Sequence, residues 1–231
     1  MVTIYGILVT NPKAPWQIEF YERDAGGCPV EDFLNGLDRP PRAKVLALIQ
    51  LLAEQGPALP FPYSSQVRGR IRELRTQYGR ENLRVLYFVA ATREWVLLHG
   101  FTKRTPKTPE RDISHRGGQD DRIPGTPKEG RLMKKPTNWD LYFRKQLGDP
   151  ETRELIEGEI ESLRVGTQIA KVRQKKRLSQ AQLAARAGMS APNISRIENG
   201  PAQNMTLETL VKIARALGHG VDVTFRARRP T

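Results

Sequence analysis

The stretch that most constrains this chain spans residues 178–200 and reads LSQAQLAARAGMSAPNISRIENG. Ser179 suits the N-cap of a helix whose apolar residues follow helical spacing. Gly188 breaks that helix, and Ser190 can cap a second one. Pro192 falls in the first turn of the second helix, where a missing N–H costs nothing. The pattern predicts two short helices joined by a tight turn.

The second helix turns Ile194 and Ile197 inward and leaves a small, polar set facing outward, as a helix in a DNA major groove requires. An ordinary αα-hairpin is the alternative. The spacing of Gln180, Gly188 and the closing Ile-Glu-Asn-Gly resembles the Cro/repressor (XRE) helix-turn-helix family over residues 163–218. The residues expected to contact DNA are Gln180, Ser190, Ala191, Pro192, Asn193, Ser195 and Arg196.

These contacts divide by chemistry. Arg196 and Asn193 are the candidates for reading base edges, Arg at guanine and Asn at adenine. Gln180 and Ser190, at helix N-termini, are candidates for phosphate contacts. A basic run adds salt-dependent affinity in this interpretation, and a solvated helix end is its alternative. The run comprises Lys171, Arg173, Lys175, Lys176 and Arg177.

The charge of the whole chain also points to a polyanion. The formal net charge is +13 over 231 residues, and basic residues outnumber acidic ones in both halves of the chain. One cysteine and three scattered histidines offer neither a disulfide framework nor a metal cluster. Neither a membrane span nor a secretory leader is visible. We therefore expect a cytoplasmic nucleic-acid protein with no metal or other cofactor.

A DNA-binding domain alone does not account for the basic first half. Residues 16–21 predict a strand, residues 29–34 and 41–55 predict helices, and residues 83–89 and 95–101 predict central strands joined by a hairpin. An arginine-rich segment precedes these central strands. The order of one strand, two helices and three strands predicts an α+β domain, an antiparallel sheet with helices on one face.

Within this half, the elements Glu-Leu-Arg, Arg-Val-Leu-Tyr and Leu-Leu-His-Gly-Phe, followed by Lys-Thr-Pro, resemble the RelE/HigB-like toxin superfamily, in the branch of phage Gp49-type proteins. The resemblance covers residues 18–113. One departure is the basic C-terminal helix that this branch carries after Lys-Thr-Pro, which the chain lacks. The resemblance implies metal-independent cleavage of mRNA in the ribosomal A site.

The resemblance assigns Arg84 to the scissile phosphate, and Arg75 is the next candidate. His99 is the candidate for proton transfer, and Lys103 for the leaving-group acid or a second phosphate ligand. Each has an alternative: an ion pair with Glu73 or Glu94 for Arg84, a satisfied core residue for His99, and a grip on ribosomal RNA for Lys103. The residues expected to bind RNA are Arg68, Arg72, Arg104 and Lys107.

Three segments follow from composition. Residues 1–113 form the toxin-like domain, and residues 114–132, rich in Gly, Pro and charge, form a flexible linker. Residues 133–231 form an all-α helix-turn-helix domain with helices expected at 138–146, 150–165 and 167–176 ahead of the motif. Residues 221–225 alternate as a short C-terminal strand, which predicts pairing with a second copy in a homodimer.

The combined interpretation is a toxin–antitoxin pair on one chain, in the manner of a HigBA-type operon. Its partners are operator DNA, mRNA and the ribosome, and its halves bind each other. Neutralisation is expected either from the helices of residues 139–160 covering the basic face of residues 68–104 or from bulk that keeps the toxin out of the ribosome. The competing interpretation is a DNA-binding transcription regulator with an inert RelE-like domain.

Overall fold

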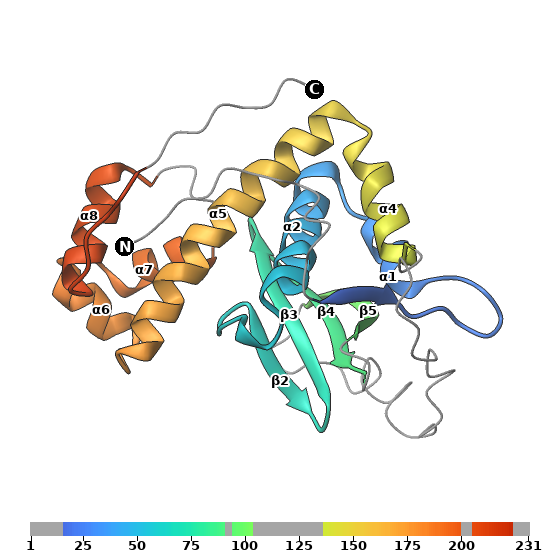
Figure 1. Ribbon diagram of the computed structural model, residues 1–231, viewed down its shortest axis with the longest axis horizontal. Coiled ribbons are helices and arrows are strands. Elements are labelled where there is room, and N and C mark those ends of the chain that lie inside the picture. Colours follow the sequence, from blue (N-terminus) through green and yellow to red (C-terminus); the bar gives the residue numbers. More distant parts are fainter. Residues whose placement is uncertain (1–15, 91–93, 104–135, 200–204, 224–231) are drawn as a thin grey trace.

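The computed structural model describes residues 16–90, 94–103, 136–199 and 205–223. Figure 1 shows a sheet-bearing region and a helical group joined by one long helix. The elements are β1 (Gln17–Phe20), α1 (Pro29–Asn35), α2 (Arg39–Gln55), η1 (Gly56–Ala58), β2 (Ser64–Arg68), β3 (Ile71–Tyr78), β4 (Glu81–Val89), β5 (Glu94–Lys103), α4 (Asn138–Leu147), α5 (Pro150–Lys175), α6 (Gln180–Ala187), α7 (Ala191–Asn199) and α8 (Leu207–Ala216).

The five strands form one sheet in the order β1-β5-β4-β3-β2. Pairing is antiparallel except between β1 and β5, which run parallel because the two helices between β1 and the later strands carry the chain back across the sheet. The predicted α+β class is confirmed. The predicted antiparallel pairing holds for β2 to β5, and the edge strand β1 differs because it runs parallel to β5.

The arginine-rich segment after α2 forms two strands where one was predicted. Gly69 lies between β2 and β3 with φ +53°, in the left-handed region that glycine adopts without strain. The chain therefore turns there, and Ser64 of β2 pairs with Leu74 of β3. Four strands therefore follow the helices instead of three, because the turn at Gly69 divides the arginine-rich segment into two strands.

The first hydrophobic core lies between the sheet and the helices on one of its faces. Leu74, Val85 and Leu97 from the strands pack with the leucines of α2. The same core includes Trp139 from α4 and Ile160 from α5. The hydrophobic core thus crosses the boundary expected at residue 133. The predicted linker, residues 114–132, lies outside the described residues.

Specific polar contacts hold α4 and α5 in place. Asn138 accepts from the Phe20 backbone N–H at 2.8 Å and donates to the Phe20 carbonyl at 2.9 Å, which satisfies the outer edge of β1. Tyr142 donates to Asn35 at 2.9 Å. Arg164 donates to both oxygens of Glu54, at 2.6 and 3.2 Å. These contacts lie against α1, α2 and β1.

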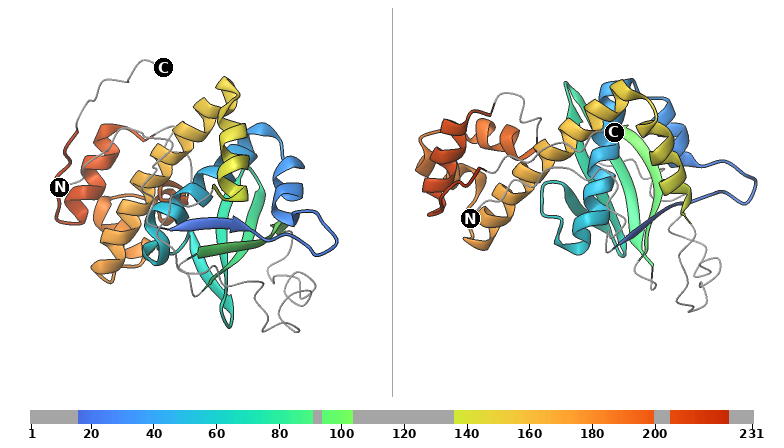
Figure 2. Two further views of the ribbon diagram at one scale, coloured as in Figure 1. Left: turned by 45° about the vertical axis from the view of Figure 1, so that its right-hand side comes forward. Right: turned by 45° about the horizontal axis from the view of Figure 1, so that its top comes forward.

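The helix α5 is continuous over 26 residues, where two separate helices were predicted. Its first part belongs to the sheet's core, and its last part joins a second core with Leu183, Ile194 and Ile213. Figure 2 shows this helix passing from the sheet-bearing region to the helix-turn-helix group in both views. The two halves of the chain share α5 as a common support.

Two further predictions fall near the described C-terminal end. Residues 221–223 are irregular, so the predicted strand over 221–225 is not formed in its described part, and its other two residues lie outside the described range. Among the described residues, the longest apolar helical stretch falls short of what crossing a membrane requires.

Candidate nucleic-acid interface

The sheet brings the four predicted catalytic residues to one face. Arg75 of β3 lies directly opposite Arg84 of β4, and Arg84 lies directly opposite Phe101 of β5. Because alternate residues of a strand share a face, His99 and Lys103 flank Phe101 on that same side. Leu74 and Val85 alternate with the arginines and point into the core under α2. The candidate site therefore lies on the face opposite α2.

Arg84 is a buried side chain, 7% exposed, at the centre of this face. Its Nη1 donates to the carbonyls of Leu83 at 2.8 Å and Thr76 at 3.1 Å. These bonds fix the guanidinium against the β3–β4 ladder. The fixed orientation is what electrostatic stabilisation of a developing charge requires, because a preorganised donor need not reorganise during the reaction.

One carboxylate, Glu73, holds both arginines. Its oxygens lie 3.6 Å from Arg75 Nε and 3.7 Å from Arg84 Nε. Arg75 also stacks over the ring of Phe61, 5.2 Å from its centroid. The structural alternative for Arg84, an ion pair with Glu73, is therefore present. It leaves two guanidinium groups against one carboxylate, so the cluster carries a net positive charge.

Opposing effects act on the pKa of the Arg84 guanidinium. Burial lowers the pKa of the Arg84 guanidinium, and the neighbouring Arg75 lowers it further, whereas Glu73 raises it. An anion close to this side chain removes part of the cost of burying its charge. The cluster is thus built to receive a negatively charged group such as a phosphate.

His99 and Lys103 lie beside this cluster. The His99 ring stacks on Phe101 with 5.9 Å between centroids and 14° between planes, and both side chains are partly exposed. Lys103 pairs with Asn82 at the end of β5. A partly exposed imidazole is accessible to a substrate, which a fully enclosed core histidine is not.

The residues predicted to bind RNA do not all lie on the same face of the sheet. Arg68 is exposed at the end of β2. Arg72 points to the other face of the sheet, where its Nε donates at 3.2 Å to both Ser64 Oγ and the buried Tyr87 hydroxyl. Its role there is structural, which argues against its prediction as an RNA contact. Arg104 and Lys107 lie outside the described residues.

The helix-turn-helix has the predicted local geometry. Ser179 accepts from the Gln182 N–H, and the Gln182 side chain returns a bond to the Ser179 N–H, so the two form a capping box. Gly188 ends α6 in the left-handed conformation, and Met189 packs on the second core. Ile194 is fully buried. Both helices lie where they were predicted.

The outward face of α7 carries the predicted DNA contacts. Pro192 and Arg196 are exposed, as is Ser190 just before the helix. Ala191, Asn193 and Ser195 are partly exposed. All of these side chains lie in or next to α7, with Arg196 as the exposed cation of the set.

A buried ion pair inside the helix-turn-helix was missed by sequence reasoning. Arg173 donates to Glu198 through Nε at 2.6 Å and Nη2 at 2.8 Å, and Gln180 adds a third bond to Glu198 at 2.8 Å. Arg173 is 6% exposed, so the expectation that it belongs to the basic approach to DNA is wrong. The sequence did carry a signal for this burial, because Arg173 lies one helical turn after Ile169 and therefore on the same, core-facing side of the helix.

The DNA-facing edge of the helix-turn-helix lies beside the arginine cluster. A cavity of about 240 Å³ separates them. From the sheet it is lined by Arg75, Arg84 and their neighbours, and from the helix-turn-helix by Gln180, Ser195 and Asn199. The helices of residues 139–160 lie instead against α1, α2 and β1. The expectation that they cover the basic face of residues 68–104 is wrong.

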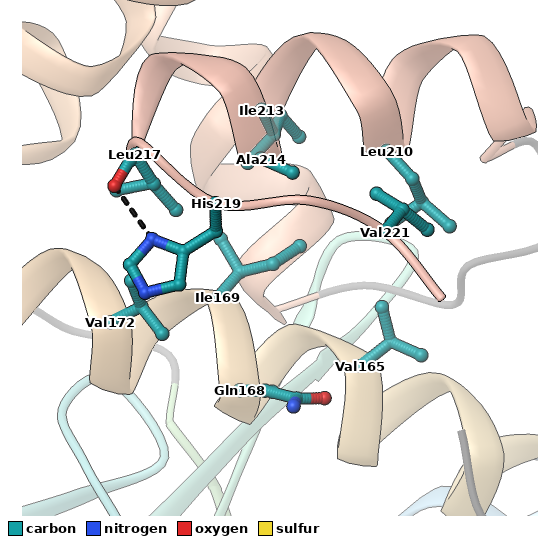
Figure 3. Close-up of a pocket in the computed structure, with 10 residues that line it drawn as sticks. All are labelled: Val165, Gln168, Ile169, Val172, Leu210, Ile213, Ala214, Leu217, His219 and Val221. Carbon is teal, nitrogen blue, oxygen red and sulfur yellow. Dashed lines mark hydrogen bonds between the residues drawn. The ribbon is translucent and has the colours of Figure 1, made fainter. Parts of the chain in front are cut away.

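A second hollow is apolar and lies between α5 and α8 (Figure 3). Val165 and Ile169 line it from α5, Leu210 and Ile213 line it from α8, and Val221 extends over it. His219 closes one end, with its Nδ1 2.7 Å from the Leu217 carbonyl. This groove is the apolar surface of the helix-turn-helix group on the side of α8.

Among the described residues, no group of three or more His, Cys, Asp or Glu side chains is placed to bind a metal ion. Cys28 serves locally, because its Sγ accepts from the Glu31 N–H at the start of α1.

Comparison with known proteins identifies two domains. Residues 32–115 match the family described as phage derived protein Gp49-like, and residues 169–222 match the helix-turn-helix family. The chain is also similar to a protein named putative toxin HigB2 from Mycobacterium tuberculosis (strain ATCC 25618 / H37Rv), with 38% identity over 74 residues. The match covers 30% of this chain and 37% of that relative. The chain thus spans little more than a third of the relative's length.

Proposed function

We propose that this chain, a Gp49-like domain joined to a helix-turn-helix domain, is a fused toxin–antitoxin module. In this proposal the N-terminal half cleaves mRNA on the ribosome, and the C-terminal half binds DNA, represses its own operon and restrains the toxin half. The observation that carries it is the Arg75–Glu73–Arg84 cluster, on the same sheet face as His99 and Lys103 and on the same chain as a DNA-binding motif.

Cleavage of RNA through its own 2′-hydroxyl needs a base, an acid and cations. The 2′-oxygen attacks the neighbouring phosphorus and loses its proton, while the bond to the 5′-oxygen breaks and that oxygen gains a proton. Arg84 and Arg75 are assigned to the charge on the phosphate oxygens. His99 is assigned to one proton transfer, and Lys103 to the other or to a second phosphate contact.

The DNA-binding half is assigned by position on α7. Arg196 and Asn193 are proposed to read base edges in the major groove, while Gln180 and Ser190 hold phosphates. A homodimer is proposed to form through the helix-turn-helix half, with the partly exposed Val165, Leu210 and Val221 beside the groove of α5 and α8 as its apolar contacts. The partners are thus operator DNA, mRNA and the ribosome, in the cytoplasm.

An inert N-terminal half is the competing proposal, favoured by one observation. The Nη1 of Arg84 is already engaged by two backbone carbonyls, as in a purely structural arginine. The regulator would then bind DNA with no enzymatic activity.

Expression of residues 1–113 alone tests the choice. Growth arrest, relieved when residues 133–231 are supplied in trans, supports the toxin–antitoxin module. Because α4 and α5 complete the core of residues 16–103, circular dichroism must confirm that the shortened protein folds. A folded fragment that neither stops growth nor cuts mRNA on programmed ribosomes contradicts the toxin assignment and leaves the regulator.

A further inference from the structure

The cavity between the two halves has an unusual composition. On one side it presents Arg75 and Arg84 from the sheet, with the amides of Gln77 and Asn82. On the other side it presents Gln180 and Asn199 from the helix-turn-helix, with the Ser195 hydroxyl. Two residues already proposed for DNA contact therefore share one space with two residues proposed for RNA cleavage.

Specific contacts hold the helix-turn-helix at this place. Gln174 near the end of α5 donates to the Phe61 carbonyl at 2.6 Å. Gln55 at the end of α2 donates to Thr167 Oγ1 at 3.3 Å. Between these bonds, Gly166 of α5 lies against the Tyr63 hydroxyl and against the α7 backbone. The cavity is thus bounded by a fixed junction.

The lining favours a phosphate group. Arg84 is 7% exposed, and the buried Nε atoms of Arg84 and Arg75 lie 3.7 and 3.6 Å from Glu73, which is too far for hydrogen bonds. The amides of Gln77, Gln180 and Asn199 line the same space and donate to Gly79, Glu198 and Ser195. Guanidinium groups recognise phosphate oxygens. A phosphodiester strand passing along Gln180 would enter this space.

We propose that this cavity is a shared site in which each half covers the phosphate contacts of the other, so that DNA on α7 and RNA on the sheet each bind only to the open chain. Each nucleic acid has to separate the halves before it binds. The proposal rests on the proposed function and adds its regulation: a chain bound to DNA exposes the Arg84 face, and a closed chain binds neither ligand fully.

The size of the cavity indicates that duplex DNA cannot enter it while the two halves are in contact. The cavity has a volume of about 240 Å³. That space accepts a phosphate group with part of its nucleotide. It does not accept a duplex, because a recognition helix enters a major groove about 12 Å wide, and the DNA must then surround the part of α7 that carries Ser195 and lines the cavity. Duplex DNA can therefore reach Gln180 and Ser195 only when the helix-turn-helix leaves the sheet.

The test locks the full chain in its closed form. Phe61→Cys and Gln174→Cys place two thiols across the junction, in a Cys28→Ser background that keeps a good N-cap for α1. A bismaleimide with a disulfide in its spacer joins them, and reduction later releases the same molecule. The probe is a duplex selected from a random-sequence library by the untreated chain.

The bridged chain is expected to lose specific binding, about 10³-fold or more in affinity, and reduction is expected to restore it. Saturating duplex is also expected to slow bridging of the untreated double-cysteine chain, a readout that does not depend on how the modified chain binds. Equal affinities before and after reduction, or bridging unaffected by duplex, overturn the proposal.

The remaining outcomes are also decisive. Failure to bridge without DNA shows that the halves do not close and overturns the shared site. Failure of the selection to enrich any sequence contradicts DNA binding itself and removes this inference together with that part of the proposed function. Restoration of binding on reduction supports the shared site without bearing on whether the toxin half cuts RNA.

Discussion

Gly166 of α5 and Tyr63 of the loop before β2 are in contact where the two halves of the chain meet. A Cβ at Gly166 would collide with the Tyr63 hydroxyl and would lie 3.0 Å from the carbonyls of Ile197 and Glu198. Tyr63 is 1% exposed, so it has little freedom to move away. The junction of the halves thus depends on the absence of one side chain.

Gly166→Ala is expected to destabilise the chain by about 1–3 kcal/mol, because the added methyl overpacks a junction formed by backbone and a buried ring. Gly158→Ala is the matched control in the same helix, since nothing lies within 4 Å of its Cβ position. That control is expected to gain about 0.5–1 kcal/mol from helix propensity. Urea unfolding monitors both, and equal effects would contradict the packing argument.

Glu198→Gln is expected to destabilise the helix-turn-helix by about 3–5 kcal/mol, because it leaves the Arg173 charge buried without its partner. The double variant Arg173→Met with Glu198→Leu is expected to recover most of that loss, since no buried charge remains. Glu208→Gln, in an exposed pair with Lys212, serves as the control and should change nothing measurable. Denaturant unfolding is the measurement; a small loss at Glu198 would refute the role of this pair.

The sequence predicted the local elements well because their determinants are local. Ser179 and Gly188 mark the ends of α6 through a cap and a left-handed turn, both properties of single residues. The register that gathers Arg75, Arg84 and His99 was not predicted, although each residue was named. Register depends on the pairing of distant strands, and one added residue would have placed Arg84 on the core face.

Long-range packing escaped the sequence for a related reason. Two helices were expected over 150–165 and 167–176, yet Gly166 between them is helical and lies in close contact with Tyr63, which is more than 100 residues earlier. Helices were expected around Trp139 and Ile160, but helical periodicity does not identify the surface that covers these side chains. That surface is the core shared with the sheet, on the side away from the arginines.

Glu19 makes stability depend on pH. The pKa of Glu19 is raised to about 7, mainly by burial and further by Glu94, Glu22 and Asp140, while a backbone hydrogen bond from Asn138 lowers it. The folded chain therefore holds a proton on Glu19 between about pH 4.5 and 7 that the unfolded chain has released. Stability from this group is present in acid and is lost as the pH rises through about 7.

Glu19→Gln is accordingly expected to flatten the stability profile over that interval and to be more stable than the parent at pH 8. The unfolding free energy, measured at several pH values in both proteins, checks this. Glu151→Gln is a suitable control, because this carboxylate is exposed on α5. An unchanged slope in the Glu19 variant would show that the proton is held elsewhere.

Arg196→Ala is expected to weaken binding to a selected duplex by about 1–3 kcal/mol and to relax the preference at one base pair. Arg215→Ala, an exposed arginine on α8, is expected to lower affinity slightly and equally for all sequences. Fluorescence anisotropy over a panel of single-base duplex variants separates the two effects. A uniform loss for Arg196 would reassign it to a phosphate.

Arg84→Ala is expected to reduce mRNA cleavage by residues 1–113 on programmed ribosomes by about 10²–10³-fold, because one fixed cation disappears from the site. Folding will not be untouched: the Thr76 carbonyl loses its donor and Glu73 loses an ion-pair partner. The cleavage rate must therefore be expressed per folded molecule, with circular dichroism supplying the folded fraction.

Arg72→Ala provides the matched control for that comparison. Its guanidinium also makes buried bonds on β3, but on the opposite face of the sheet. Its loss should lower stability while the rate per folded molecule stays the same. Lys103→Ala should show a smaller defect, partly rescued at low salt if its charge only holds RNA. A folded Arg84→Ala protein that cuts at the normal rate would show that Arg84 takes no part in the chemistry. The rate per folded molecule does not depend on any loss of stability.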